Sequence, residues 1–526
     1  MAMNLVWEPW IPVIDAEGKA REYSIYDTLL NAHRLRAIRD PMPTVEFGLH
    51  RLLASIVMDI YKLSGWPKLR DVIRSGKFDE TEIRAYFDQW ASRFELFYSD
   101  SPFLQNTDTL ELPIVSVALL VHSVPTGTNV IHHHHAYERE FAIGPKAAAR
   151  LLTTLAPFCT AGGRGKSPSI NGAPPWYLLI TGNTLFETIC MNYPASSAAE
   201  QQLGLPAWRR QGDLPDRAVR VTMLEAYTWQ PRKLSLIPVE EPGICSVTGE
   251  RVTTVIRDMR FGNGATCDEL LKENWQDPAI AYRVRGKNDG DQRERYPARP
   301  SEGKPLWRDC GPLLLLDDER HAVMRPKLID QFEQLAKDRV PPTQLGFCMY
   351  GMRTDLKTKV FEWYAEPLTL PQGLILKRSY HRAILQMLTD ADDIALLVKR
   401  AIKKTGPEGK EVFEGLANHQ VATFWFDIRP IYQHHIEEIA TLAESSDAEK
   451  VLDRRLKFFN AVTSTAIALF ERTINGFTAN GRQIFQSQAT ARRGLLDDIA
   501  KKRKAMYPKD SSVPKGRSQP PKESTI

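Results

Sequence analysis

The sequence predicts an α+β protein in which a large, irregular mixed N-terminal domain is followed by an antiparallel four-helix bundle. The chain has 526 residues, 43% apolar and 25% charged, which is the composition of a folded protein with room for two or three units. Over residues 1–372 short apolar runs alternate with helical stretches, and turns rich in Gly, Pro and Asn interrupt them. From residue 379 onward the apolar residues recur every three or four positions, as in amphipathic helices.

The N-terminal domain, residues 1–372, contains no internal repeat. Helical periodicity is clear over residues 45–63, and residues 147–155 also predict a helix. Strands are predicted from the apolar runs at 113–121, 176–180 and 313–316. Residues 289–304 include the polar run DGDQRER, so we expect them to form an exposed loop.

Four helical stretches make up residues 373–507. They cover residues 379–405, 421–445, a stretch that begins at 446, and 482–507. Gly406-Pro407 is a strong helix stop, Pro430 should kink the second helix, and residues 446–449 fit a capping box. Amphipathic helices with short connections are typical of an antiparallel bundle. Residues 508–526 are rich in Pro, Ser and Lys, and predict a disordered basic tail.

The charge of the chain is unevenly distributed. The formal net charge is +5, from 69 Lys or Arg and 64 Asp or Glu. Residues 501–526 alone hold eight basic and two acidic residues, so the first 500 residues carry a net charge of −1. The global charge therefore does not indicate a broad nucleic-acid surface, and local asymmetry has to be considered instead.

Several classes of protein are excluded by simple patterns. No apolar stretch approaches the roughly 18–20 residues that span a bilayer, and the N-terminus lacks the basic region and apolar core of a signal peptide. The six cysteines form no CxxC pair and no framework spacing, which favours free thiols in a reducing compartment. These observations predict a cytoplasmic protein.

The most distinctive segment is TAGGRGKS, residues 160–167. It ends like a phosphate-binding P-loop, but Thr160 stands where the first glycine of that motif belongs. A P-loop lies between a strand and a helix, whereas here a helix is predicted before the segment, and the prolines at 168, 174 and 175 exclude one after it. A P-loop-like nucleotide hydrolase that uses Lys166 and Ser167 is the alternative function that the sequence leaves open.

The same region is free of acidic residues. Between residues 144 and 186 there is no Asp or Glu, although Lys146, Arg150, Arg164 and Lys166 are present. Glycines let a backbone approach a base edge or a phosphate closely, and the flanking Arg and Lys supply positive charge. This pattern indicates a nucleic-acid contact, and a flexible surface turn is the alternative.

Histidines and cysteines give no complete metal site. At most two of the four histidines at 132–135 could share one ion in an extended segment. The pair His434-His435 supplies only fragments of a di-iron helix motif, so we interpret it as solvated helix surface. Cys245 and Cys267 lack partners, because Thr248 occupies the position that a CxxC pair would need. We therefore expect no metal, zinc included, no other cofactor and no catalytic residue.

Three short motifs together resemble the large subunit of the type I-E CRISPR surveillance complex Cascade, the CasA family. Residues 4–13, NLVWEPWIPV, are similar to the family's N-terminal signature, residues 100–105, DSPFLQ, to its HPFLQ motif, and residues 229–231 to its WQP motif. Their order and the terminal helices cover nearly the whole chain. The resemblance implies a non-catalytic subunit for antiviral defence that binds other Cascade subunits, crRNA and double-stranded target DNA.

The resemblance also implies which residues meet the DNA. In this family the large subunit recognises the protospacer-adjacent motif (PAM) of the duplex, largely from the minor groove, and starts the strand separation that forms the R-loop. The family's glycine loop is matched by Gly162, Gly163, Arg164, Gly165 and Lys166. A basic residue after the WQP motif contacts the same PAM, and its best match is Arg260, with Arg257 as the fallback.

Two further elements of the family are matched with differences. The strand wedge at a hairpin tip is matched by Asp355, Leu356 and Lys357, and Leu356 stands where family members often carry glutamine. Because an apolar wedge still unstacks bases, we expect strand separation to persist and PAM preference to change. The loop that docks on crRNA and the backbone subunits is matched by Asn129, Ile131, His132, His133 and His134.

The resemblance gives the terminal helices a function as well. In the family they contact DNA and the small subunits, and the large subunit helps to recruit the helicase–nuclease effector. The basic run at residues 501–504 could bind phosphate, or it is a solvated helix end. A purely structural scaffold without DNA contact is a third hypothesis.

Overall fold

The chain divides into two compact units, Met1–Arg378 and Ser379–Ile526. The computed structural model describes residues 3–97, 100–124, 140–162, 166–195, 197, 202–212, 217–286, 293–300, 307–308, 323–338, 346–356, 359–368, 380–406, 411–442, 448–476 and 482–506. The predicted domain boundary at 372–373 and the predicted tail at 508–526 lie outside the described residues, so both stay predictions.

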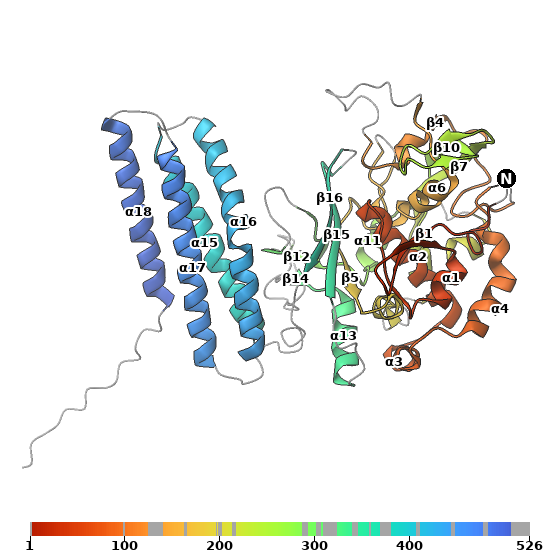
Figure 1. Cartoon of the computed structure of the whole chain (residues 1–526), viewed down its shortest axis with the longest axis horizontal. Helices are drawn as coiled ribbons and strands as arrows, with labels where there is room; N and C mark the ends of the chain where they lie inside the picture. Colours follow the sequence, from red (N-terminus) through yellow and green to blue (C-terminus); the bar gives the residue numbers. More distant parts are fainter. Residues whose placement is uncertain are drawn as a thin grey trace, which may run out of the picture. The chain divides into compact units, whose positions relative to one another are not determined.

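Small sheets run through the N-terminal unit (Figure 1). The order β2-β1-β3 joins Ala20–Tyr23, Ile11–Asp15 and Leu35–Ile38. The order β4-β10-β7 joins Ile114–Ser116, Val255–Asn263 and Arg232–Val239. The order β16-β15-β5 joins Val360–Leu368, Gly346–Thr354 and Tyr177–Thr181. The order β13-β12-β14 joins Arg293–Pro297, Tyr282–Gly286 and Val323–Met324. Two short pairs are β6 with β11 (Arg217–Ala218, Thr266–Cys267) and β8 with β9 (Gly243–Ile244, Arg251–Val252).

Helices surround these sheets. They are α1 (Ile25–Leu30), α2 (Pro43–Tyr61), α3 (Trp66–Ser75), α4 (Glu80–Trp90), α6 (Pro145–Leu152), α7 (Leu155–Phe158), α8 (Leu185–Met191), α10 (Met223–Tyr227), α11 (Glu269–Asn274) and α13 (Lys327–Lys337). Short 3₁₀ turns are Ala91–Phe94, Val117–Leu120 and Ala207–Arg209. Mixed α/β structure, the fold class predicted from the sequence, is confirmed for this unit.

Helix α2 is the centre of the N-terminal unit. Proline at its first turn fits a helix start, and Lys62 in the left-handed conformation ends it. Nearly all of its side chains are buried, polar ones included, because helices α4, α6, α7, α8 and α10 and the hairpin β15–β16 contact it. A Cβ on Gly48 would lie 2.6 Å from Oγ1 of Thr153, so only glycine allows the chain after α6 to approach the helix this closely.

A buried ion pair joins α2 to the rest of this core. The guanidinium of Arg51 donates to both carboxylate oxygens of Asp277, at 2.8 and 3.2 Å, and both side chains are buried. The guanidinium also lies 3.9 Å from the ring centroid of Tyr227. Asn171 donates to Asp277 at 3.1 Å and accepts from the indole of Trp275 at 2.8 Å. Segments from four parts of the sequence therefore meet at one charge pair.

The C-terminal unit consists, in its described part, of four long helices. They are α15 (His381–Lys403), α16 (Glu411–Leu442), α17 (Ala448–Asn475) and α18 (Arg482–Met506). Helix α15 contacts each of the other three. The predicted helix boundaries agree within a few residues except for α16, which starts ten residues before the predicted Val421 and continues through Pro430.

Two sequence interpretations are wrong. Residues 289–304 are not simply a loop, because they include β13, which pairs with β12. In this register Tyr282 lies opposite Pro297, and Gly286 lies opposite Arg293. His435 is not solvated surface: it is buried with its ring 5.7 Å from that of Phe458, and burial lowers its pKa. His434 beside it is exposed, as expected. None of the described helices is long and apolar enough to cross a membrane.

We predict that Arg51→Met lowers the free energy of unfolding by about 3–5 kcal/mol, because it leaves the Asp277 carboxylate buried without its partner. Urea unfolding of the full chain followed by circular dichroism measures this. Arg36→Met, at an exposed position of β3, is the matched control and should change stability by less than about 0.5 kcal/mol. A loss below about 1 kcal/mol for Arg51→Met would show that the pair does not hold the core.

Candidate nucleic-acid interface

The glycine segment begins where α7 ends and returns on itself. The amide of Gly162 donates to the carbonyl of Lys166 at 3.1 Å, and the amide of Ser169 donates to the carbonyl of Cys159 at 2.9 Å. Gly163, Arg164 and Gly165, which stand between Gly162 and Lys166 in the sequence, lie outside the described residues. The two limbs of the segment are thus held together by their own backbone.

A buried arginine fixes both limbs. The guanidinium of Arg232, the first residue of β7, donates to the carbonyl of Thr160 at 2.7 Å and to the carbonyl of Ser167. These carbonyls stand seven residues apart, on opposite limbs of the segment. Burial raises the pKa of the nearby Cys159 thiol, and the charge of Arg232 opposes that shift. Arg232 therefore holds the segment through two backbone carbonyls. Among the described residues, no carboxylate pairs with its positive charge.

Lys166 lies beside the same arginine. Its Nζ is 5.7 Å from the ring centroid of Phe261 on β10, and the guanidinium of Arg232 is 6.0 Å from that centroid. A Cβ on Gly162 would lie 2.9 Å from Cδ of Lys166 and 3.1 Å from Nη2 of Arg232. Among the described residues, neither cation forms an ion pair with a carboxylate. Two positive charges thus gather at the base of the glycine segment.

The two other described basic residues of the acid-free stretch have structural partners. Lys146 and Arg150, both on α6, each pair with the carboxylate of Glu22. Arg150 also donates from Nε to the carbonyl of Trp10 at 2.8 Å. The positive charge expected over residues 144–186 is therefore concentrated near Lys166, within the described part of the stretch.

The order of elements around the glycine segment is the reverse of a P-loop. A P-loop places a strand before the glycines and a helix after them, so that the helix N-terminus meets the phosphates. Here helix α7 precedes the segment, and an irregular stretch followed by strand β5 comes after it. This topology offers Lys166 and Ser167 no helix N-terminus, and it does not favour a nucleotide hydrolase.

The two candidate arginines lie on β10. Arg260 donates to the carbonyl of Leu110 at 2.6 Å and to that of Leu112 at 3.3 Å. Phe261 faces Lys166 and Arg232, so Arg260, its neighbour in the strand, points to the opposite face. Arg257 lies at a register irregularity and pairs with Glu241. The structure does not bring these two arginines together with the glycine segment, and their contact with DNA stays a prediction.

The predicted wedge lies at the tip of the hairpin β15–β16. Asp355 closes this turn, since its amide donates to the carbonyl of Lys359 at 3.1 Å and its carboxylate accepts from the amide of Lys359 at 3.0 Å. Leu356 has a φ of +64°, which is unusual for a branched side chain, and 64% of its surface is exposed. Lys357 lies outside the described residues. The turn thus presents an apolar side chain to solvent.

The base of the same hairpin is anchored in the core. Tyr350 on β15 donates from its hydroxyl to the carboxylate of Glu46 on α2. Burial raises the pKa of Glu46, while the bonds from Tyr350 and Arg39 oppose the shift. A Cβ on Gly351 would lie 2.4 Å from the ring of Trp176, so glycine lets the strand pack against this indole. The exposed tip is therefore carried by a rigid stem.

Other predicted residues cannot be placed. The proposed docking-loop residues Asn129, Ile131, His132, His133 and His134 lie outside the described residues. Cys245 is buried, and Thr248 bonds to Glu250. Among the described residues no group of three or more His, Cys, Asp or Glu side chains could hold a metal ion. The expectation that the protein has no zinc and no other cofactor stays a prediction.

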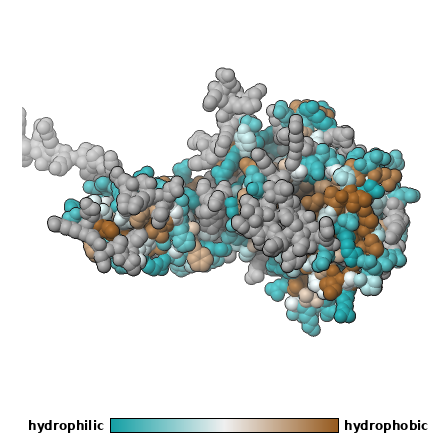
Figure 2. Space-filling view, turned by 90° about the horizontal axis from the view of Figure 1, so that it is seen from above, coloured by the Kyte–Doolittle hydropathy of each residue, from teal (hydrophilic) through white to brown (hydrophobic). Residues whose placement is uncertain are grey.

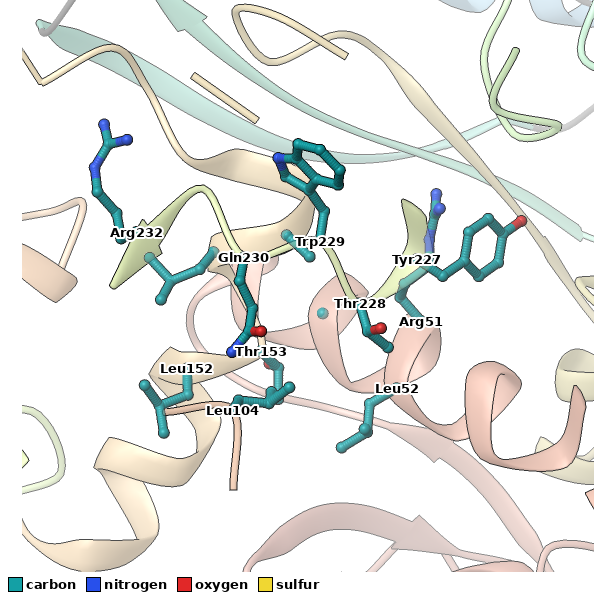
Figure 3. A pocket seen from close by; sticks show the side chains of 13 residues that line it. Arg51, Leu52, Leu104, Leu152, Thr153, Tyr227, Thr228, Trp229, Gln230 and Arg232 are labelled. Carbon is teal, nitrogen blue, oxygen red and sulfur yellow. The ribbon is translucent and has the colours of Figure 1, made fainter. Parts of the chain in front are cut away.

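Arg232 is a residue of this site that the sequence does not single out. The only local sign of its role is its position, directly after the Trp229-Gln230-Pro231 motif. Figure 3 shows Arg232 and Arg51 on opposite sides of residues 227–230, around a cavity of about 30 Å³. That volume suits a single water and no nucleotide. The motif thus separates the clamp of the glycine segment from the buried ion pair.

Comparison with known proteins identifies the family. The model of the CRISPR-associated protein Cse1 family matches residues 4–466. The chain belongs to the Cse1 (CasA) family. The CasA/Cse1 protein of Thermus thermophilus is 31% identical over 398 residues, which are 72% of each chain. Cse1 of Acidimicrobium ferrooxidans has the same fold, with a TM-score of 0.76 and 20% identity over 97% of this chain and 99% of that one. A chain of a CRISPR RNA-guided surveillance complex has a TM-score of 0.71 and 19% identity over 94% and 99%.

The motifs that resemble the Cse1 family have structural positions in this chain. Trp10 is buried and donates from its indole to the carbonyl of Leu5 at 2.9 Å. Gln105 donates to the carbonyl of Leu96 and accepts from the amide of Leu236, both at 2.8 Å. Trp229 is buried beside the clamp. Gln105 therefore binds β7, the strand that begins with the clamp residue Arg232.

We predict that Arg232→Gln frees the glycine segment. Losing charged donors to two carbonyls should speed amide hydrogen exchange over residues 160–169 by about tenfold or more. Arg260→Gln is the matched control, because Arg260 lies on the opposite face of β10. Exchange mass spectrometry of both variants measures the effect. Unchanged exchange in Arg232→Gln, or equal changes in both variants, would contradict the clamp.

Proposed function

We propose that this chain is the non-catalytic large subunit of a crRNA-guided Cascade complex of type I-E in the cytoplasm. In this function it recognises a PAM on double-stranded DNA, starts strand separation and R-loop formation, and helps to recruit the effector helicase–nuclease. Membership of the Cse1 family and the likeness to a chain of a CRISPR RNA-guided surveillance complex support the assignment. Protein recognition of a short duplex tag, with base pairing reading the rest, is the general logic of guided systems.

The observation that carries this proposal is the charge at the glycine segment. Lys166 and Arg232 lie within about 6 Å of one aromatic ring, and no described carboxylate neutralises either cation. Glycines have no side chain, so a glycine segment fits into a narrow minor groove. The negative electrostatic potential of that groove attracts cations that no carboxylate neutralises. The buried clamp fixes this segment in advance, so little ordering is needed when DNA binds.

The hairpin β15–β16 supports the strand-separation step of the proposal. Its tip presents Leu356 to solvent, while Tyr350 and Gly351 fix its stem on α2 and Trp176. Proteins that kink duplexes insert apolar side chains between base steps, at a cost of a few kcal/mol per step. Such a wedge requires a rigid stem, because a flexible hairpin would bend away from the duplex before the bases unstack.

The proposed partners fit the exposed apolar surface. One face of the N-terminal unit carries an apolar area (Figure 2). The exposed large apolar side chains of this unit include Trp7, Leu110, Ile114 and Leu119. Apolar patches of this kind mark protein interfaces, here with the backbone, small and crRNA-end-binding subunits. We also propose that α15–α18 form one antiparallel four-helix bundle. The contacts of α15 with the other three helices support this.

The basic end of α18 offers a phosphate contact. Lys501 and Lys502 pair with Asp498 and Asp393, whereas Arg503 and Lys504 stand in the last turn without a described ion pair. Two free cations at a helix end suit the backbone of a displaced or target strand.

We predict that Gly163→Asp, Lys166→Ala and Arg260→Ala each weaken binding of the assembled complex to a PAM-containing duplex about tenfold or more. Added negative charge or lost positive charge at the duplex contact is the reason. Binding to a target that is already single-stranded should be unchanged. Equilibrium binding to the two DNAs measures both effects. Equal losses on both would remove these residues from PAM recognition, and no loss would favour a scaffold without DNA contact.

We predict that Leu356→Ala slows R-loop formation about tenfold while initial duplex binding stays within twofold, because the wedge acts after the first contact. Stopped-flow fluorescence of a base analogue beside the PAM measures strand opening. Leu270→Ala, at an exposed leucine of α11, is the matched control. Wild-type opening kinetics for Leu356→Ala would refute the wedge.

A further inference from the structure

A cavity of about 340 Å³ adjoins the glycine segment at Ser167. Its lining begins at Ser167, continues along the chain to Gly172, and includes Trp275 together with Tyr296 and Arg299 from the region of β13. Pockets for small ligands start at about this size. The cavity shares Ser167 with the segment that we propose meets the DNA, and no function has been assigned to the cavity itself.

The cavity has a positive wall. Arg299 donates from Nε to the carbonyl of Ala173 at 3.0 Å and pairs with no carboxylate among the described residues. Burial lowers its pKa, so its positive charge is poorly solvated there. Gly172 has a φ of +76°, and a Cβ on this residue would lie only 3.1 Å from Nη2 of Arg299. An anion in the cavity could accept charge-assisted hydrogen bonds from this guanidinium, in place of the water that burial removes, and would therefore be bound favourably.

The remaining walls suit a base and a sugar. Tyr296 lines the cavity and is 36% exposed, and aromatic side chains are the usual stacking partners of bases in single strands. Ser167 contributes a hydroxyl, and the buried Asn171 orients Trp275 by accepting from its indole. The only acidic side chain among the described lining residues is Glu294, which is exposed on β13. Phosphate, sugar and base thus each have a chemical counterpart in a space of nucleotide size.

We propose that this cavity binds one nucleotide of a single DNA strand, with its phosphate on Arg299 and its base against Tyr296. The inference rests on the proposed function, because strand separation next to the glycine segment would deliver such a nucleotide. Holding one nucleotide of the opened duplex would oppose reannealing.

The test is the affinity of the full chain for a fluorescein-labelled deoxythymidine dodecamer, measured by anisotropy over a series of salt concentrations. Arg299→Gln should weaken binding about tenfold and reduce the slope of log affinity against log salt by about 0.7, the value for one phosphate contact on a single strand. Tyr296→Ala should weaken binding about fivefold and leave the slope unchanged, because stacking involves no counterion release.

Two controls keep the result specific. Arg36→Gln removes an exposed arginine of β3 and should bind within twofold of wild type. Arg299→Lys keeps the charge and should restore the wild-type salt slope, which a misfolded loop would not. Wild-type affinity for Arg299→Gln, an equal loss in Arg36→Gln, or no binding of the dodecamer by the unmodified chain would each overturn the proposal.

The outcome can be separated from that of the proposed function. The PAM preference of the assembled complex is measured on duplexes with and without the motif. If PAM preference is present but the cavity variants bind the dodecamer like wild type, the cavity assignment alone fails. If the unmodified complex shows no PAM preference, the proposed function fails, whatever the dodecamer result.

Discussion

The buried ion pair between Arg51 and Asp277 is the constraint on which the rest of the N-terminal unit depends. Removing two charges from water is costly, and only good geometry with further hydrogen bonds offsets that cost. Here Asn171 and the Tyr227 ring complete the set. Because Asn171 follows the glycine segment by a few residues, the same network that holds the core also fixes one end of the proposed DNA contact.

Helix α2 transmits this rigidity to both candidate DNA-contacting elements. Arg51 on one turn binds Asp277, which also accepts from Asn171 in the segment after the glycines. Glu46 on an earlier turn binds Tyr350 in the stem of the hairpin β15–β16. Arg232 then clamps the glycine segment from the opposite side. The proposed duplex reader and the proposed strand wedge would both need such support, because a wedge has to meet a defined base step.

The sequence predicts those parts of the fold and site that depend on local signals. The long helices of the C-terminal unit and α2 follow from apolar spacing alone, and the prolines after residue 167 exclude a P-loop helix. Strand β13 escapes prediction because its Arg and Glu side chains resemble a solvated loop. The role of Arg232 cannot be predicted from the sequence, because it depends on long-range packing that brings Thr160 and Ser167 to this side chain. Arg260 is adjacent in sequence to Phe261 yet lies on the opposite face.

The proposed recognition of the PAM requires the glycine segment to touch the duplex. Disulfide trapping tests it most directly: Lys166→Cys in the assembled complex is offered duplexes with a tethered thiol in the minor groove of the PAM. Cys267 is replaced by serine, since the other described cysteines are buried. The account predicts rapid cross-linking to the PAM and little to the same thiol on a duplex with a changed motif. No cross-link, or equal cross-linking to both duplexes, would contradict it.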